Sequence, residues 1–330
     1  MGGALMALVT KSAGDGITFE EWNALVTALQ QAGDLTGIGG TGIDGVLADI
    51  TGDVWLQPSA LTLASGGHTC KPFTIIRCTG DVTISGTLTP QKRRTTITDM
   101  AAGVDYYHGM PIGRLLQAGA GELNGASDGE GGGGCFGAGG TGDDVPLVSG
   151  GRGFGDNANA ANLFTASDLW RVGVPMAGPG GNVGPTKGGA GPTLIVLSEG
   201  VITISGTIDL DGEDGGDVGG DRGAGAGGVF IGISTKEMDG SGGTINARGG
   251  YGANSNAGGG GGYVCGIAPV VTMPTVVVTG GSADAAPNDV GRDGASYSTT
   301  ALTVAQIRDV ARSIIYGGLT GPGSILGLDV

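Results

Sequence analysis

The amino-acid sequence predicts a mainly β protein whose body is a parallel β-helix, or a similar solenoid, with glycine-rich turns and short N- and C-terminal helices. Three observations predict this fold: a repeated strand motif, its return at a regular spacing, and glycine tracts that precede apolar strands. The 330 residues include 75 glycines, about three times the usual share of roughly 7%. Because 39% of residues are hydrophobic and only 14% are charged, the composition does not fit a disordered chain.

The repeated motif is TISGT, which occurs in VTISGTLT at residues 82–89 and in ITISGTID at residues 202–209. In both copies, apolar side chains alternate with threonine and serine. This period of two is typical of a strand with one buried face. The β-branched residues of the motif suit a pleated sheet.

A weaker copy, SGGTINARGG at residues 241–250, places Ile245 37 residues after Ile208, and Val278 follows 33 residues later. A period of this length predicts a solenoid or a propeller. The sequence lacks the tryptophan and aspartate signature of a WD propeller, so a parallel β-helix is favoured. Each coil of such a fold buries its apolar face against the next coil.

Glycine has two uses in this fold. It allows positive φ angles where a coil turns a corner, and it allows stacked backbones to approach closely. An alternative is that tracts such as 131–134 and 258–262 form polyproline-II-like rods that hydrogen-bond to each other laterally. The sequence favours the β-helix, with polyglycine-II rods as a local feature.

Residues 1–64 are predicted to form an attachment or oligomerisation segment with a helix at 18–31. Thr18 and Glu21 form a capping box. The apolar stripe of this helix either packs on its own domain or forms a bundle between subunits. Its residues are Trp22, Leu25, Val26 and Leu29.

The body is expected at residues 65–300, with 90–175 as an insertion that breaks the repeat. Residues 301–330 are predicted to form a helical cap and a tail. Thr303 and Gln306 form a second capping box at the start of a helix. We expect this helix to cover the terminal coil with the apolar residues Val304, Ile307, Val310, Ala311 and Ile314.

The net charge of −15 disfavours nucleic acid as a partner, because phosphates would be repelled, and it disfavours an anionic membrane surface. The N-terminal apolar run is too short for a membrane span or a signal peptide. Cys70, Cys78, Cys135 and Cys265 form no metal-ligand pattern with the two histidines. They are interpreted as thiols without chemistry, with a Cys70–Cys78 disulfide as the alternative.

The acidic turn DLDGEDGGD at residues 209–217 offers the main candidate chemistry. Its carboxylates are candidate calcium ligands, although the EF-hand spacing is not met and a solvated turn is the simpler interpretation. Asp209 and Asp211 also share the outward face of a strand, where a glycosidase could place two carboxylates. No other catalytic motif is present, so a non-enzymatic protein without a cofactor is favoured. The candidate calcium ligands are Asp209, Asp211, Asp214 and Asp217.

Aromatic residues are candidate platforms for sugar rings. The basic run Lys92–Arg94 is interpreted as a solvated loop. The candidate carbohydrate contacts are Tyr106, Tyr107, Trp170, Tyr251 and Tyr263.

In the segments ITISGTIDLDG, SGGTINARGGYG and AGGGGGY, the chain resembles glycine-rich β-helical proteins of bacteriophage tail fibres and tailspikes. This resemblance covers residues 190–290 and the copy at 82–89. It implies a homotrimer that docks to other virion proteins through its N-terminal part and contacts a host surface glycan or protein. It also implies location in the virion, after assembly in the host cytoplasm. The sequence leaves three alternatives open: a polysaccharide-degrading β-helix enzyme, a bacterial surface adhesin and a head-decorating protein.

Overall fold

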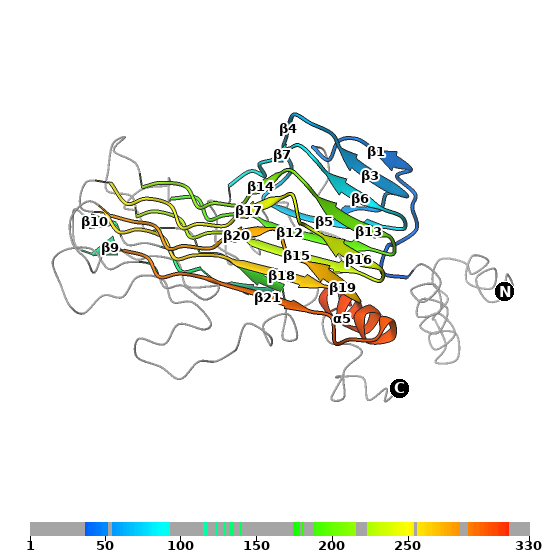
Figure 1. Ribbon diagram of the computed structural model, residues 1–330. Helices are drawn as coiled ribbons and strands as arrows, with labels where there is room; N and C mark the ends of the chain where they lie inside the picture. Colours follow the sequence, from blue (N-terminus) through cyan, green and yellow to red (C-terminus); the bar gives the residue numbers. More distant parts are fainter. Residues whose placement is uncertain are drawn as a thin grey trace, which may run out of the picture.

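The part of the chain that the structure describes is mainly β, with three large parallel sheets and one short helix (Figure 1). The computed structural model describes residues 37–51, 55–92, 115–117, 123–124, 128–129, 132–134, 139, 174–178, 180, 188–215, 223–253, 256–283 and 290–316. The predicted N-terminal helix and most of the predicted insertion lie outside these residues.

The three sheets are named A, B and C, and their strands are given in the order in which they lie side by side. Sheet A consists of β1 (Val46–Leu47), β3 (Ala60–Leu63), β6 (Val82–Ile84), β13 (Val201–Ile204), β16 (Glu237–Asp239) and β19 (Val270–Thr272). Sheet B consists of β2 (Trp55–Leu56), β5 (Phe73–Cys78), β12 (Thr193–Ser198), β15 (Val229–Ser234), β18 (Tyr263–Ile267) and β21 (Ala295–Thr299). Sheet C consists of β4 (Gly67–His68), β7 (Thr87–Leu88), β14 (Thr207–Asp209), β17 (Thr244–Asn246) and β20 (Thr275–Val277).

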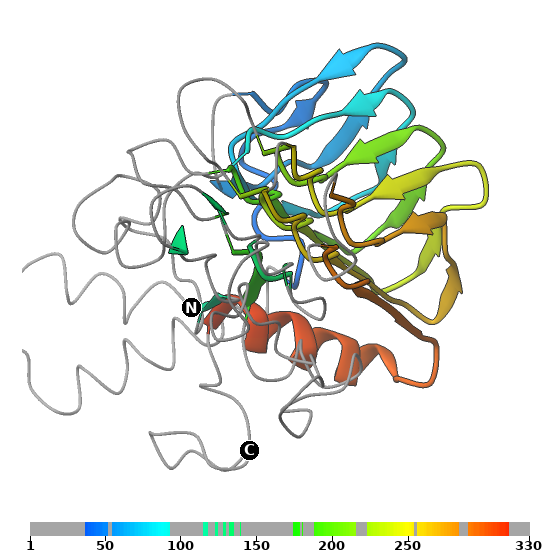
Figure 2. The ribbon, with the colours of Figure 1, turned by 90° about the vertical axis from the view of Figure 1, so that its left-hand side faces the viewer.

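From β2 onward, the chain visits sheets B, A and C in that order and then returns to sheet B. One such passage is called a coil here. Figure 2 shows successive coils stacked from the blue strands to the orange ones. This arrangement is consistent with the predicted parallel β-helix. Two smaller pairs lie outside the coils: β8 (Leu115–Gln117) with β11 (Val174–Met176), and β9 (Leu123–Asn124) with β10 (Asp128–Gly129).

The two TISGT motifs lie directly on top of each other, although 120 residues separate them. Ile204 is paired with Ile84, and Ile208 is paired with Leu88. The glycine of each motif occupies the corner between sheets A and C. A Cβ atom on Gly206 would lie 2.1 Å from the carbonyl oxygen of Gly86, so this corner excludes any side chain. The coils that carry the two motifs are therefore direct neighbours in the stack.

The later repeats follow the predicted spacing in part. Ile208 is paired with Ile245, which confirms the spacing of 37 residues. Ile245 is paired with Val276 and not with Val278, so the next spacing is 31 residues and the predicted partner was two residues too far along. The alternating pattern allows both valines to point inward, because they are two residues apart.

The core between the sheets consists of columns of stacked aliphatic side chains. The column of sheet C contains Leu88, Ile208 and Ile245, which are all fully buried. In sheet B, the inward positions of β15 and β18 include Gly232 and Gly266. A Cβ atom on Gly232 would lie 2.8 Å from the ring of Phe230, and a Cβ atom on Gly266 would lie 2.7 Å from the sulfur of Met273. These glycines therefore give room to the large side chains of the neighbouring columns.

Strands β12, β15 and β18 of sheet B are buried on both faces, and this explains their largely apolar sequences. The outer face of sheet B includes Ile195, Ile231 and Cys265, which are paired in register and fully buried. Helix α5 (Val304–Tyr316) contacts β15 of this sheet.

Helix α5 begins with the predicted capping box, because Gln306 N donates to Thr303 Oγ1 and Thr303 N donates to Gln306 Oε1. Ile307, Val310, Ala311 and Ile314 are buried as expected, whereas Val304 is 37% exposed. The helix contacts β15, which belongs to the coil before the last one, on the apolar outer face of sheet B.

Beyond sheet C, the coils extend into glycine segments that form no regular strands. Gly225 and Gly228 donate hydrogen bonds to segment 210–215, Ala224 and Gly227 donate to segment 256–262, and Ala226 donates to Gly178. The direction of the N–H groups thus repeats every three residues, as in a polyproline-II-type helix. A Cβ atom on Gly259 would lie 2.0 Å from the carbonyl oxygen of Gly225. Glycine is therefore required because neighbouring backbones touch.

Candidate functional site

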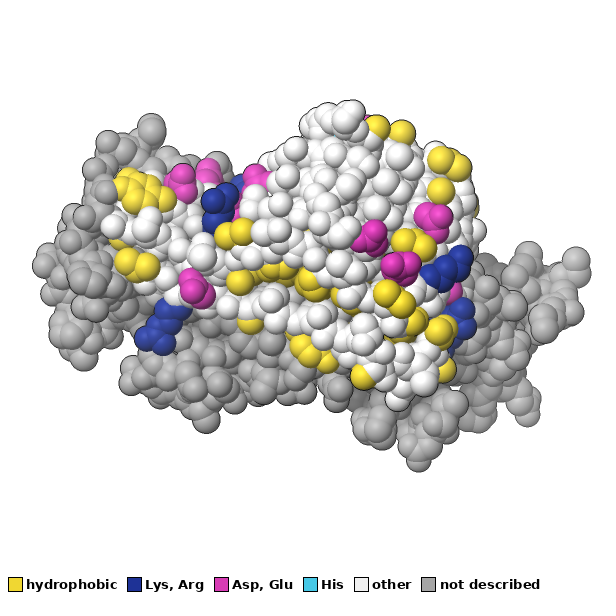
Figure 3. All heavy atoms as spheres, in the orientation of Figure 1, with side chains coloured by type: hydrophobic (Ala, Val, Ile, Leu, Met, Phe, Trp, Pro, Cys, Tyr) yellow, Lys and Arg dark blue, Asp and Glu magenta, His cyan; other side chains and the backbone are white. Residues whose placement is uncertain are grey.

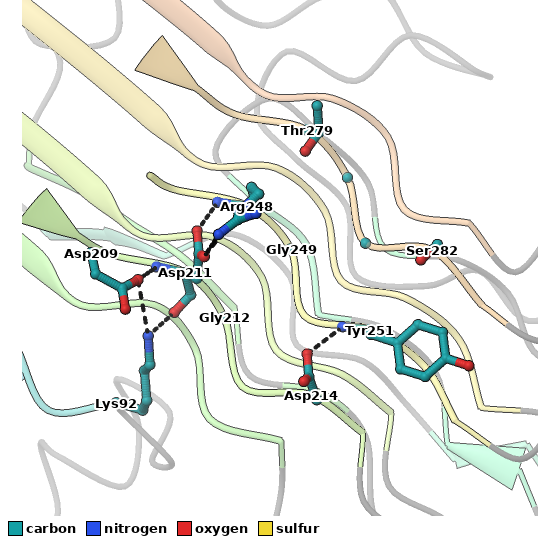
Figure 4. A pocket seen from close by; sticks show the side chains of 12 residues that line it. Lys92, Asp209, Asp211, Gly212, Asp214, Arg248, Gly249, Tyr251, Thr279 and Ser282 are labelled. Carbon is teal, nitrogen blue, oxygen red and sulfur yellow. Dashed lines mark hydrogen bonds and ion pairs between the residues drawn. The ribbon is translucent and has the colours of Figure 1, made fainter. Parts of the chain in front are cut away.

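A group of polar side chains lines an open hollow where sheet C continues into the glycine segments (Figure 4). The hollow has a volume of about 510 Å³. Three successive coils contribute to it at equivalent positions, since Gly212 N donates to Arg248 O and Gly249 N donates to Thr279 O. Its lining residues are Lys92, Asp209, Asp211, Gly212, Asp214, Arg248, Gly249, Tyr251, Thr279, Gly280, Gly281 and Ser282.

Asp211 and Arg248 form the central ion pair of the hollow. Arg248 Nη2 lies 2.7 Å from Asp211 Oδ2, and Nε donates to the same oxygen at 3.0 Å. The other carboxylate oxygen, Oδ1, accepts a hydrogen bond from the backbone N–H of Arg248 at 2.7 Å. The hydrogen bond and the negative charge of Asp211 raise the pKa of the Arg248 guanidinium group. Asp211 therefore holds two coils together.

Asp209 and Asp214 also accept backbone hydrogen bonds. Asp209 Oδ1 accepts one from Asp211 N at 3.1 Å and lies 3.8 Å from Lys92 Nζ. Lys92 Nζ also donates to the carbonyl oxygen of Asp211. Asp214 Oδ1 accepts a hydrogen bond from Tyr251 N at 2.7 Å. The aspartates of the acidic turn therefore bind neighbouring backbone groups and Lys92, a structural role that the sequence did not indicate.

Several groups in the hollow are open to a ligand. The side chain of Arg248 is 50% exposed, and Tyr251 is 36% exposed. Asp214 and Thr279 are exposed, and Ser282 is also exposed. Figure 4 shows Tyr251 at one end of the hollow and Lys92 at the other. Figure 3 shows acidic and basic side chains next to each other on this part of the surface.

The structure brings together four of the predicted site residues, Asp209, Asp211, Asp214 and Tyr251. Tyr263 is fully buried in β18, so its ring does not offer the exposed platform that was expected. The other predicted residues lie outside the described part of the chain. These are Asp217, Tyr106, Tyr107 and Trp170, together with the helical stripe Trp22, Leu25, Val26 and Leu29.

Sequence reasoning missed Arg248, Thr279 and Ser282, and it interpreted Lys92 only as part of a solvated loop. A signal for Arg248 was present. Asp211 and Arg248 are 37 residues apart, which is also the spacing between Ile208 and Ile245. Applied to the polar positions, the repeat places the guanidinium group beside the carboxylate.

Among the described residues, no group of three or more histidine, cysteine, aspartate or glutamate side chains is arranged to hold a metal ion. Cys70, Cys78 and Cys265 are buried free thiols, so the alternative of a Cys70–Cys78 disulfide is not what the structure contains. The described part of the chain includes no helix with the length and apolarity needed to span a membrane.

Comparisons with protein-family models, with curated proteins and with solved structures gave no match to this chain.

Proposed function

We propose that the chain is a rigid adhesive module of a bacteriophage virion, built as a parallel β-helix whose coils continue into polyglycine-II rods. In this proposal, the hollow around Arg248 and Tyr251 contacts a glycan of the host surface. The observation that carries the proposal is that three consecutive coils present charged, hydroxyl and aromatic groups around one open hollow.

The chemistry of the hollow suits a sugar. Sugar hydroxyls form hydrogen bonds with carboxylates, guanidinium groups and other hydroxyls, and a tyrosine ring can pack against the apolar face of a sugar ring. Lys92 and Arg248 lie beside three aspartates, so the hollow has no strong net charge. A sugar chain with many hydroxyl groups fits this mixture better than a polyanion does.

The scaffold suits a mechanical role. Hydrogen bonds join each glycine segment to several neighbours, and the side chains of the core columns are fully buried. Such a scaffold holds the lining residues in fixed positions, and several copies on one virion would multiply weak contacts with the host. Assembly as a homotrimer through the N-terminal helix belongs to the same proposal.

Binding of the full chain to a glycan array and to purified bacterial lipopolysaccharide tests the glycan contact. We expect Tyr251→Ala to weaken binding at least tenfold. The control Val46→Ala removes an exposed apolar side chain that is remote from the hollow, and it should bind like the unmodified chain. Equal binding by both variants would contradict the role of the hollow.

The alternative of a polysaccharide-degrading enzyme keeps some support, because Asp209 and Asp211 line the same hollow. It predicts the release of reducing ends from the bound polysaccharide, and it predicts that Asp209→Asn abolishes this release. Binding without such release favours the adhesive function.

A further inference from the structure

The side chains that line the hollow include two parallel rows of three residues. Each row crosses three neighbouring backbone segments, which follow strands β14, β17 and β20. Gly212 N donates to Arg248 O, and Gly249 N donates to Thr279 O. These hydrogen bonds align one residue of each segment. The first row consists of Asp211, Arg248 and Thr279.

The second row lies three residues further along each segment. Gly215 N donates to Tyr251 O, and Gly252 N donates to Ser282 O. This row therefore has the same alignment as the first. In Figure 4, each residue of the second row is displaced in the same direction from its counterpart in the first row. The second row consists of Asp214, Tyr251 and Ser282.

The backbone between the rows has a period of three residues. The N–H groups of Arg248 and Tyr251 donate to aspartates on one side, and those of Gly249 and Gly252 donate to the segment on the other side. A polyproline-II-type segment rises about 9 Å in three residues and returns to the same orientation. The side chains of the two rows therefore point the same way, about 9 Å apart.

The floor between the rows consists of backbone. Glycines from all three segments line the hollow there. The carboxylate of Glu213, which also comes between the rows in the sequence, instead accepts a hydrogen bond from Gly189 N at 2.8 Å. A sugar ring can therefore lie against this floor without displacing a side chain. The glycines are Gly212, Gly249, Gly280 and Gly281.

The two rows repeat the same chemistry. Each row begins with a carboxylate and ends with a hydroxyl group, and its central residue is Arg248 or Tyr251. Asp211 is partly exposed, and the other members of the two rows are exposed. A site that is repeated along a segment suits a ligand that repeats along its own length. A single sugar, or the end of a chain, would contact only one row.

We propose that the hollow binds the interior of a linear polysaccharide whose chain runs along the glycine segments and contacts both rows. This inference rests on the proposed function, in which the hollow contacts a glycan. In an extended β-linked polysaccharide, the same ring face recurs at every second sugar, over a length comparable with the distance between the rows. Carboxylates accept hydrogen bonds from sugar hydroxyls, and Arg248 donates hydrogen bonds to them. The ring of Tyr251 packs against a sugar ring of the next repeat.

Polysaccharide fragments of graded length test this inference. The probe is the O-antigen polysaccharide released from bacterial lipopolysaccharide and cut into fragments of two, four and eight sugars. We expect the affinity of the full chain, measured by titration calorimetry, to rise about tenfold or more between two and four sugars, because the longer fragment reaches the second row. A further increase to eight sugars should be small.

The variant Tyr251→Ala/Ser282→Ala removes two side chains of the second row, and it should bind fragments of two and four sugars equally well. The matched control Val46→Ala/Thr62→Ala removes an exposed apolar side chain and an exposed hydroxyl group from sheet A. It should retain the step in affinity. A step that persists in the first variant would overturn the inference.

A second measurement needs no variant. Recognition of the chain interior predicts that the number of protein copies bound per polysaccharide molecule, measured by analytical ultracentrifugation, rises with polysaccharide length. A number that does not depend on length would indicate recognition of the chain end and would overturn the inference.

The outcomes separate this inference from the proposed function. Equal affinities for two and four sugars, or a gain merely proportional to length, would overturn the inference and leave the glycan contact in place. Binding to the short glycans of an array without binding to the O-antigen polymer would do the same. No binding to either would contradict the proposed function and the inference together.

Discussion

Arg308 Nη2 lies 2.9 Å from Glu199 Oε2, and this ion pair joins helix α5 to the corner between sheets B and A, 109 residues earlier in the chain. The other oxygen, Oε1, accepts a hydrogen bond from Ile38 N at 2.8 Å. Thr235 Oγ1 donates to Oε2 at 3.0 Å. One carboxylate therefore holds the N-terminal segment, the next coil and the C-terminal helix against the stack.

We expect Glu199→Gln to lower the free energy of unfolding by about 1.5–3 kcal/mol, the usual contribution of a hydrogen bond to a charged group. The matched control is Asp309→Asn. It removes the charge that pairs with Arg312 at 3.2 Å, where the aspartate side chain is 65% exposed, and it should change stability by less than about 1 kcal/mol. Urea unfolding measures both values. Equal effects of the two substitutions would contradict the structural role of Glu199.

The same carboxylate makes the docking of α5 sensitive to acid. Burial alone would raise the pKa of Glu199, but hydrogen bonds from Arg308, Ile38 and Thr235, together with the charge of Arg308, lower it below the ordinary value. Because the pKa of Glu199 is lower in the folded chain than its unfolded value of about 4.3, the ionised carboxylate stabilises the folded state above that pH. This stabilisation is lost as the pH falls through the pKa that Glu199 has in the folded state.

We therefore expect the amide protection factors of α5, which correct for the intrinsic exchange rate at each pH, to fall below about pH 4. In Glu199→Gln, the helix should exchange faster already at neutral pH, and the acid-dependent step should be absent. If protection of the α5 amides depends on pH in the same way in the unmodified chain and in Glu199→Gln, Glu199 is not the acid-sensitive group.

The glycine segments should not tolerate a methyl group. Gly259→Ala places a Cβ atom 2.0 Å from the carbonyl oxygen of Gly225. We expect a loss of about 3 kcal/mol or more, because the obstacle is backbone on a neighbouring segment. Gly67→Ala is the control, since a Cβ atom there meets nothing within 4 Å. Thermal unfolding followed by circular dichroism compares the two variants, and a normal melting temperature for Gly259→Ala would refute the close approach.

The buried thiols should be inert in the folded protein. Burial raises the pKa of Cys70 to about 11 and that of Cys265 to about 12, and it also raises the pKa of Cys78. Because the thiolate is the reactive form, a Cys135→Ser protein at pH 8 should not react with a disulfide reagent until denaturant is added. Three thiols should then react together. Rapid reaction of Cys265 in the native state would indicate that sheet B opens locally.

The sequence by itself determined the mainly β class and the inward positions of the strands, because a period of two is a local feature of the chain. It also predicted the start of α5, since Thr303 and Gln306 cap the helix across one turn. It predicted four residues of the hollow, three as carboxylates of one acidic turn and Tyr251 as a candidate sugar contact, but not that these residues lie together.

The tertiary structure alone decided the rest. Val276 rather than Val278 lies beside Ile245, because the length of the intervening loop sets the register. Thr279 and Ser282 reach the hollow from a coil whose register the repeat did not predict, and α5 packs on sheet B because that outer face is apolar. These relationships depend on which backbones lie side by side, and where the sequence repeat becomes irregular no local pattern predicts them.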